Sequence, residues 1–140
     1  MSGDANEVTF TDDELAFLHT VIDLARRGES EQVLGLIDQG IPADLTDHKG
    51  DSLIILAAYH GHSELVHGLV ARGADVNRVN ERGQTALTCA VFRQNASLVR
   101  HLLAHGGDPL QGGVNALATT EMFDLPELRS IITNHLGRRV

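Results

Sequence analysis

The sequence is poor in cysteine, in aromatic residues and in long apolar runs. One of its 140 residues is cysteine, so an internal disulfide and a cysteine-based zinc site are both excluded. No apolar run approaches the ~18 residues of a membrane-spanning helix. The acidic residues 1–14 also lack the basic region and apolar stretch of a secretory signal. We therefore expect a cytoplasmic protein that does not bind membranes.

Positive charge is scarce too. The formal net charge is -8, which makes wholesale attraction to nucleic acid unfavourable. Hydrophobic residues make up 42% of the chain and charged residues 21%, as in ordinary folded proteins. A chain of 140 residues is long enough to bury one useful core. These values predict one folded domain that does not recognise nucleic acid.

The first helix is predicted by its N-terminal cap. Residues 1–9 show no periodicity and are expected to form a flexible acidic tail. Thr11 and Glu14 have the spacing of a capping box, and Phe10 and Leu15 that of a hydrophobic staple. The apolar stripe that should face the core continues along this helix as Leu15, Leu18, Ile22 and Ala25, and Gly28 ends it.

The rest of the chain repeats a pair of short helices. Apolar residues and glycines recur 33 positions apart, as in Gly40, Gly73 and Gly106. The last interval falls to 30, so Gly83 matches Gly113 and the last loop is three residues shorter. The expected helix pairs cover about 10–28 and 30–39, 52–60 and 63–72, 85–94 and 96–105, and 115–123 and 126–136. The repeat domain is then 10–137, in units of about 10–40, 41–73, 74–106 and 107–137, followed by a tail of 138–140.

Two segments carry a recognisable pattern. Residues 50–77, GDSLIILAAYHGHSELVHGLVARGADVN, and residues 83–108 resemble the ankyrin repeat. The threonine-proline-leucine-histidine corner of that family reads Ser52-Leu53-Ile54-Ile55 and Thr85-Ala86-Leu87-Thr88, which keeps the capping hydroxyl but not the proline or the histidine. The resemblance implies an all-α solenoid of about four stacked helix-turn-helix units, two full repeats between capping units.

The resemblance also implies a concave groove that binds another protein. The positions after the paired small residues of the inner helices would face it, namely Arg26, Arg27, Tyr59, His60, Phe92, Arg93, Met122 and Phe123. Aromatic, methionine and arginine side chains are typical of interface cores. The alternative is that some of these rings pack between repeats instead.

Loop tips should project beside this groove. Those that we assign to partner binding are His48, Lys49, Asp51, Glu81, Arg82 and Gln84. Six of the eleven Lys and Arg residues fall on this side, which suggests a partner with an acidic surface; the alternative is a mixed solvated surface. We expect the free protein to be a monomer, and a further alternative has the acidic tail fold across the groove.

Eight histidines raise the possibility of a metal site. His101 and His105 have an i, i+4 spacing, and His67 or His135 from a neighbouring unit could add a third ligand. Surface histidines without a function are the simpler interpretation, and we assign no metal or cofactor. Cys89 is expected to be a small buried residue, so nothing in the sequence supports catalysis.

The sequence therefore predicts a non-enzymatic interaction module, an accessory or regulatory subunit. The alternative is a protein that responds to a metal or a small molecule through histidines of the outer helices.

Overall fold

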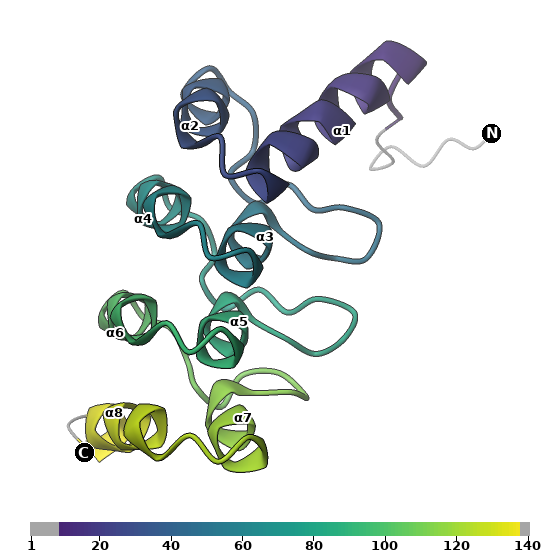
Figure 1. Cartoon of the computed structure of the whole chain (residues 1–140). Coiled ribbons are helices and arrows are strands. Elements are labelled where there is room, and N and C mark those ends of the chain that lie inside the picture. The colour runs from purple at the N-terminus through teal and green to yellow at the C-terminus, as the bar shows by residue number, and fades with distance from the viewer. Residues whose placement is uncertain (1–8, 138–140) are drawn as a thin grey trace.

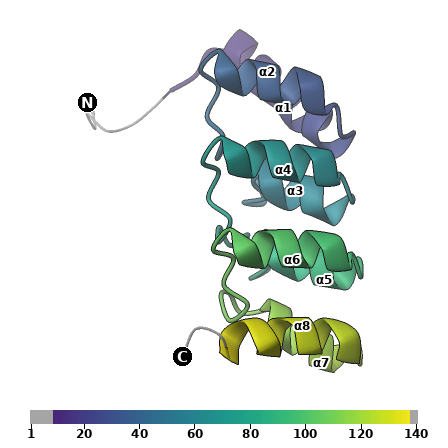
Figure 2. The ribbon, with the colours of Figure 1, turned by 90° about the vertical axis from the view of Figure 1, so that its left-hand side faces the viewer.

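The computed structural model describes residues 9–137, and within them the fold is all-α. The predicted tails, 1–9 and 138–140, lie outside this range except for residue 9. Inner and outer helices alternate along the chain and form two rows (Figures 1 and 2). The inner row is α1 (Asp12–Arg26), α3 (Leu53–Tyr59), α5 (Ala86–Phe92) and α7 (Ala116–Met122), and the outer row is α2 (Ser30–Asp38), α4 (Ser63–Ala71), α6 (Ala96–Ala104) and α8 (Pro126–Gly137). The predicted all-α solenoid is confirmed.

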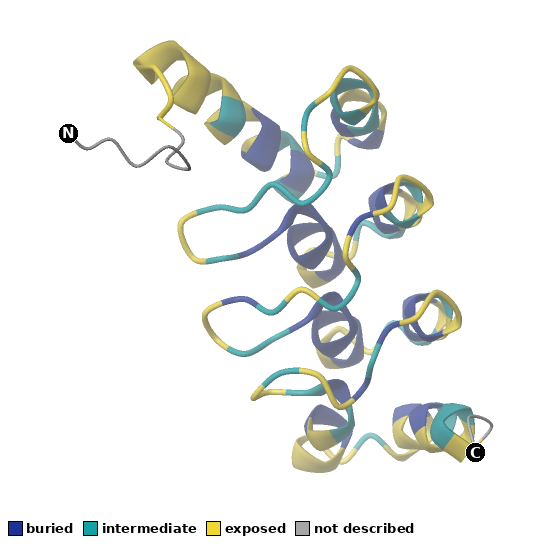
Figure 3. Ribbon diagram, turned by 180° about the vertical axis from the view of Figure 1, so that it is seen from behind, coloured by how far each residue is buried: buried dark blue, intermediate teal, exposed yellow. Residues whose placement is uncertain are grey.

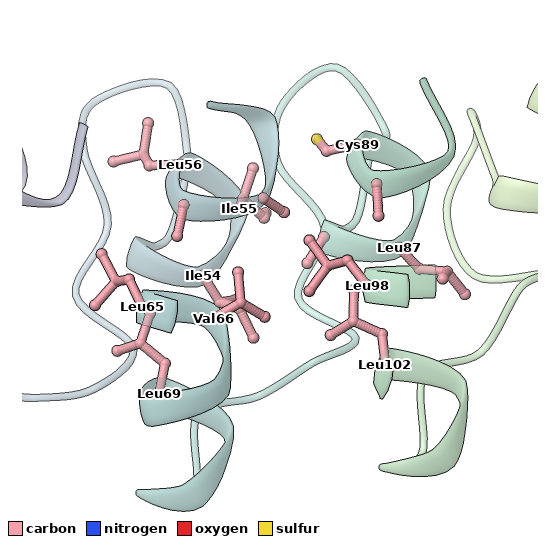
Figure 4. Close-up of a cluster of buried hydrophobic side chains, with 14 of the residues drawn as sticks. Ile54, Ile55, Leu56, Leu65, Val66, Leu69, Leu87, Cys89, Leu98 and Leu102 are labelled. Atoms are coloured by element: carbon pink, nitrogen blue, oxygen red, sulfur yellow. The ribbon is translucent and has the colours of Figure 1, made fainter. Parts of the chain in front are cut away.

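The two central inner helices form the core of the stack. Every residue of α3 and of α5 except the last is buried, on all sides of the helix. The outer helices add one apolar face each at the predicted spacing of 33, as Leu65 and Leu98 illustrate (Figure 4). A helix that is apolar all round needs neighbours on every side, so these helices are stable only within the stack.

Helix α1 departs from the prediction in its first half. The capping box is present, since Thr11 Oγ1 accepts a hydrogen bond from the Glu14 amide and Glu14 Oε1 accepts one from the Thr11 amide. However, Leu15, expected to face the core, is exposed, whereas Val21, which we did not assign to the stripe, is fully buried. The reason is length: α1 has 15 residues against 7 in the other inner helices, so its first turns project past the stack on the side of the loops (Figures 1 and 3).

Two hairpin loops, 46–52 and 79–85, are joined to each other and to the last loop by backbone bonds. The Glu81 amide donates to the Lys49 carbonyl at 3.1 Å, and the Val114 amide donates to the Gly83 carbonyl at 2.9 Å. Gly83 is required here because its φ is +80° and a Cβ would lie 3.2 Å from the backbone of the last loop. In that loop Gly112, not the predicted counterpart Gly113, has the left-handed conformation. The shorter loop therefore reaches the hairpin by a different backbone path.

The predicted hydroxyl caps are present at both corners. Ser52 Oγ accepts from the Ile55 amide at 3.3 Å, and Thr85 Oγ1 accepts from the Thr88 amide at 3.2 Å. Thr88, at the position of the missing histidine, also donates its hydroxyl to the Val114 carbonyl at 2.8 Å. The threonine that replaces the histidine therefore still links its unit to the next one by a hydrogen bond. The sequence alone did not predict this bond.

Two helical glycines at equivalent positions have different surroundings. Gly68 of α4 faces Leu34 of α2, and a Cβ on Gly68 would overlap the end of that leucine side chain. A Cβ on Gly35 of α2 would meet nothing within 4 Å. Gly68 therefore makes room for the packing of two outer helices, whereas Gly35 has no such role.

This contrast predicts different effects of the same substitution. Gly35→Ala should raise the free energy of unfolding by about 0.5–1 kcal/mol, because alanine loses less backbone entropy in a helix. Gly68→Ala has the same advantage, but the end of the half-buried Leu34 side chain must move to admit the Cβ, so its gain should be smaller. Urea denaturation of both variants measures the difference, and an equal gain from both would contradict the assignment of Gly68.

Candidate functional site

Exposed apolar side chains follow the buried inner helices at their C-terminal ends. Tyr59 ends α3 and is 42% exposed, and Phe92 ends α5 and is 51% exposed. Met122 ends α7, and Phe123, which follows it, has its ring centroid 5.6 Å from that of Phe92 in an edge contact. The rings of Phe92 and Phe123 thus touch across neighbouring units, but both remain accessible from outside.

Two adjoining hollows lie beside these rings, and together we call them the groove. The first is about 230 Å³ and the second about 310 Å³, and both are lined by Tyr59 and Arg82. The first also contacts the predicted residues Arg26, His48, Lys49, Asp51 and His60. The second contacts the predicted residues Gln84 and Phe92. The structure therefore brings most of the predicted partner-binding residues to one continuous surface between the inner helices and the hairpins.

Two of the predicted cations are neutralised by carboxylates of the protein itself. Arg26 bonds Asp23 at 2.7 Å and Asp47 at 3.2 Å. Arg82 lies 3.5 Å from Asp51 and also bonds the Gln84 side chain at 3.2 Å. The groove side is therefore less positive than the six Lys and Arg residues predicted there would suggest.

Asp51 does not project from a loop tip as predicted. It is 6% exposed, and its Oδ1 accepts a hydrogen bond of 2.7 Å from the Asn80 side-chain amide. A buried carboxylate needs such partners because it has lost its hydration. Asp51 thus joins the two hairpins, in parallel with the Glu81–Lys49 backbone bond.

Three predicted residues that line neither hollow are also exposed. They are Arg27, Glu81 and Arg93. The guanidinium of Arg93 reaches back over Gly61 of the preceding unit. Among the ion pairs of residues 9–137, none involves Arg27, Lys49 or Arg93.

His60 lies between aromatic and cationic neighbours. Its ring is in edge contact with Tyr59 at 5.1 Å and faces His62 at 6.0 Å. Burial lowers the pKa of His60, and the nearby His62, Arg93 and Arg26 lower it further. The neutral form of His60 is therefore favoured near neutral pH, where it adds polar and aromatic surface to the groove without charge.

Sequence reasoning missed two exposed apolar residues of the last loop, Leu110 (55%) and Val114 (36%). Apolar residues where the two hairpins carry polar ones could have drawn attention to them. It also missed a larger hollow, about 730 Å³, between α6 and α8. The walls of that hollow carry Arg100 together with Asp124 and Glu127, so its charge favours no one class of ligand.

Three histidines of the outer helices meet in a stack. The ring centroid of His101 lies 3.9 Å from that of His67 and 4.3 Å from that of His105. The Nε2 atom of His101 is hidden from solvent and has no hydrogen-bond partner. Within residues 9–137, however, no group of three or more histidine, cysteine, aspartate or glutamate side chains is arranged to hold a metal ion. The stack thus gives no support to the metal-responsive alternative.

Cys89 offers no reactive thiol. It is 2% exposed on α5, and burial raises the pKa of its thiol to about 12. The nucleophile in cysteine chemistry is the thiolate, which this environment disfavours. The described part of the chain also contains no helix with the length and apolar character needed to cross a bilayer.

The burial of Asp51 predicts a structural role for its side chain. Asp51→Ala should lower the free energy of unfolding by about 1–3 kcal/mol, because the buried Asn80 amide loses a partner. The matched exposed change Lys49→Ala should stay within about 0.5 kcal/mol of the original protein. Urea denaturation tests both. If Asp51→Ala is as stable as Lys49→Ala but no longer binds the partner, Asp51 contacts the partner and the structural role is wrong.

The histidine stack predicts a dependence of stability on pH. Burial, followed by His67 and His105, lowers the pKa of His101, so the unfolded chain binds the proton more readily. Stability is therefore full above the ordinary histidine pKa of about 6.5 and is lost as the pH falls below it. The melting temperature should fall between pH about 7.5 and about 5.5, and His101→Gln should reduce that fall. His19→Gln, an exposed change on α1, serves as the control, and an equal fall in all three proteins would contradict the prediction.

Comparison with known proteins gives the family. The family model of ankyrin repeats in three copies matches residues 21–112, which is more than half of the chain. A protein of Pseudomonas aeruginosa described as an ankyrin repeat protein is 52% identical over 44 residues. That match covers 31% of this chain, which spans about a quarter (26%) of the length of the relative. The matched repeats and the paired-helix stack agree, and the chain belongs to the ankyrin repeat family.

Proposed function

We propose that this protein binds another protein through the groove and the hairpin tips, and that it acts as an accessory or regulatory subunit. Ankyrin repeats are generally protein–protein interaction modules. The observation that carries the proposal is the exposure of Tyr59 and Phe92 at the ends of helices that are otherwise fully buried. Both rings border hollows, where a partner's side chains could enter and bury them.

Burial of these two rings by a partner would contribute to the binding free energy. Removing one aromatic side chain from water contributes ~1.5–3 kcal/mol. Tyr and Trp are enriched among the residues that dominate binding energy, and a ring fixed at a helix end loses little conformational freedom on binding. Tyr59 and Phe92 are 42% and 51% exposed, so only about half of that gain remains for each ring. Together they would contribute ~1.5–3 kcal/mol of a micromolar affinity of about 8 kcal/mol.

The charges around the groove support a partner with an acidic surface. Arg27, Lys49 and Arg93 are exposed and have no carboxylate partner among residues 9–137. Cations of this kind accelerate association with an acidic surface and add little affinity once salt screens them. Since the protein as a whole is acidic, with a net charge of -8, this local excess would orient the partner toward the groove. We take the free protein to be a monomer.

Affinity capture tests this function. Tyr59→Ala with Phe92→Ala should abolish capture of the partner from a lysate, because ~1.5–3 kcal/mol of burial is lost. Helical content by circular dichroism should not change, since neither side chain belongs to the buried core cluster. The control is Leu15→Ala with Phe17→Ala, which removes exposed apolar side chains from α1, away from the two hollows. If the groove variant still captures the same protein, identified by mass spectrometry, the proposed function is wrong.

A further inference from the structure

We propose that the groove takes a chain segment of the partner whose acidic and apolar residues lie in separate halves. The acidic half would lie over the two hairpins and the ends of α1 and α3, and the apolar half over the ends of α5 and α7 and the last loop. This inference rests on the proposed function and specifies the chemistry of the segment that binds. It follows from how charge and apolar surface are distributed along the stack.

The cationic half is defined by the side chains that remain unpaired. Arg27 follows α1 directly, Lys49 lies in the first hairpin, and Arg93 reaches back over Gly61 of the second unit. Within hairpin residues 46–52 and 79–85, Asp47 bonds Arg26 and Asp51 bonds Asn80. Those bonds leave one hairpin carboxylate, that of Glu81, against these three cations. The first two units as a whole are acidic, so the excess of positive charge is local to the hairpins and the adjoining helix ends, where it favours an acidic segment.

The apolar half has a different composition. No lysine or arginine occurs between Arg100 and Arg129, a stretch that includes the last loop and α7. The exposed large apolar residues of this stretch are Leu110, Val114, Met122 and Phe123. Phe92 at the end of α5 adds a fifth. Met122 is 71% exposed, and the edge contact between Phe92 and Phe123 holds two of the rings in place. The touching rings of Phe92 and Phe123 form exposed apolar surface that spans two units, and such surface marks an interaction site.

The shorter last loop accounts for the change between the two halves. The two hairpins project on the same side of the stack and carry polar tips, whereas the last loop projects less far on that side (Figure 1). The Val114 amide is bonded to the Gly83 carbonyl, which fixes the loop against the second hairpin. The apolar half is therefore not covered by a charged hairpin of its own, and a partner can reach it directly.

Selection from a peptide library tests the inference without knowledge of the natural partner. Random 16-residue peptides displayed on phage are selected on the full chain, and affinities of the selected peptides are measured by fluorescence polarisation. We expect peptides with aspartate and glutamate in one half and aromatic or aliphatic residues in the other. Lys49→Glu should weaken binding about tenfold, and Phe123→Ala should do so by a similar factor.

Double-mutant cycles, which combine a change in the protein with a change in the peptide, show where each half of the peptide binds. The loss from Lys49→Glu should vanish when the acidic half of the peptide is replaced by serine, and the loss from Phe123→Ala should vanish when the apolar half is replaced. Arg100→Glu on α6 and Phe17→Ala on α1 are matched controls that should leave the affinity unchanged. Salt should weaken binding of the original peptides and have little effect once the acidic half is gone.

The outcomes separate this inference from the function on which it rests. The inference is wrong if the selected peptides lack an acidic and an apolar half. It is also wrong if replacing the same half of the peptide removes the effects of both the Lys49 and the Phe123 substitutions. If such peptides still fail to bind the Tyr59→Ala, Phe92→Ala protein, binding at the groove stands. If selected peptides bind that protein as well as the original one, or if no peptide is selected, groove binding fails and the inference fails with it.

Discussion

The structure depends on the burial of two inner helices that are apolar on all sides. In α3 and α5 every residue but the last is buried, so neither helix can be stable without a unit on each side and an outer helix behind it. The cost of ordering so short a helix is offset by contacts between units rather than within them. Folding of one unit therefore requires its neighbours, and the stack behaves as one cooperative body.

This dependence leaves few residues free to bind a partner. Within the central units, most apolar positions belong to the core, most glycines to the turns, and hairpin residues such as Asp51 and Asn80 to the links between units. What remains exposed lies at the ends of inner helices, at hairpin tips and on the outer helices, and the first two of these border the groove. The same contacts hold those side chains in place, so the groove is largely formed before a partner arrives, which lowers the entropic cost of binding.

The sequence predicted the helix pairs, their spacing and the caps because each depends on local chemistry that recurs. Thr11 with Glu14, the hydroxyls of Ser52 and Thr85, and the 33-residue spacing all fall in this class. Predictions from the sequence were wrong or missing where the burial or role of a residue depends on contacts between units. The burial of Asp51 follows from an Asn80 amide 29 residues away, and the role of Gly68 follows from Leu34 on another helix. The exposure of Leu15 follows from the absence of a unit beside the first turns of α1 in the described chain, which periodicity within one helix cannot reveal.

A partner bound at the groove would cover the inner-helix ends and the hairpin tips. Hydrogen–deuterium exchange of the protein alone and in complex with its captured partner measures this directly. Exchange should slow in the hairpins at 46–52 and 79–85 and at the C-terminal ends of α3, α5 and α7. Slower exchange confined to the outer helices α2, α4 and α6, with the hairpins unchanged, would contradict binding at the groove.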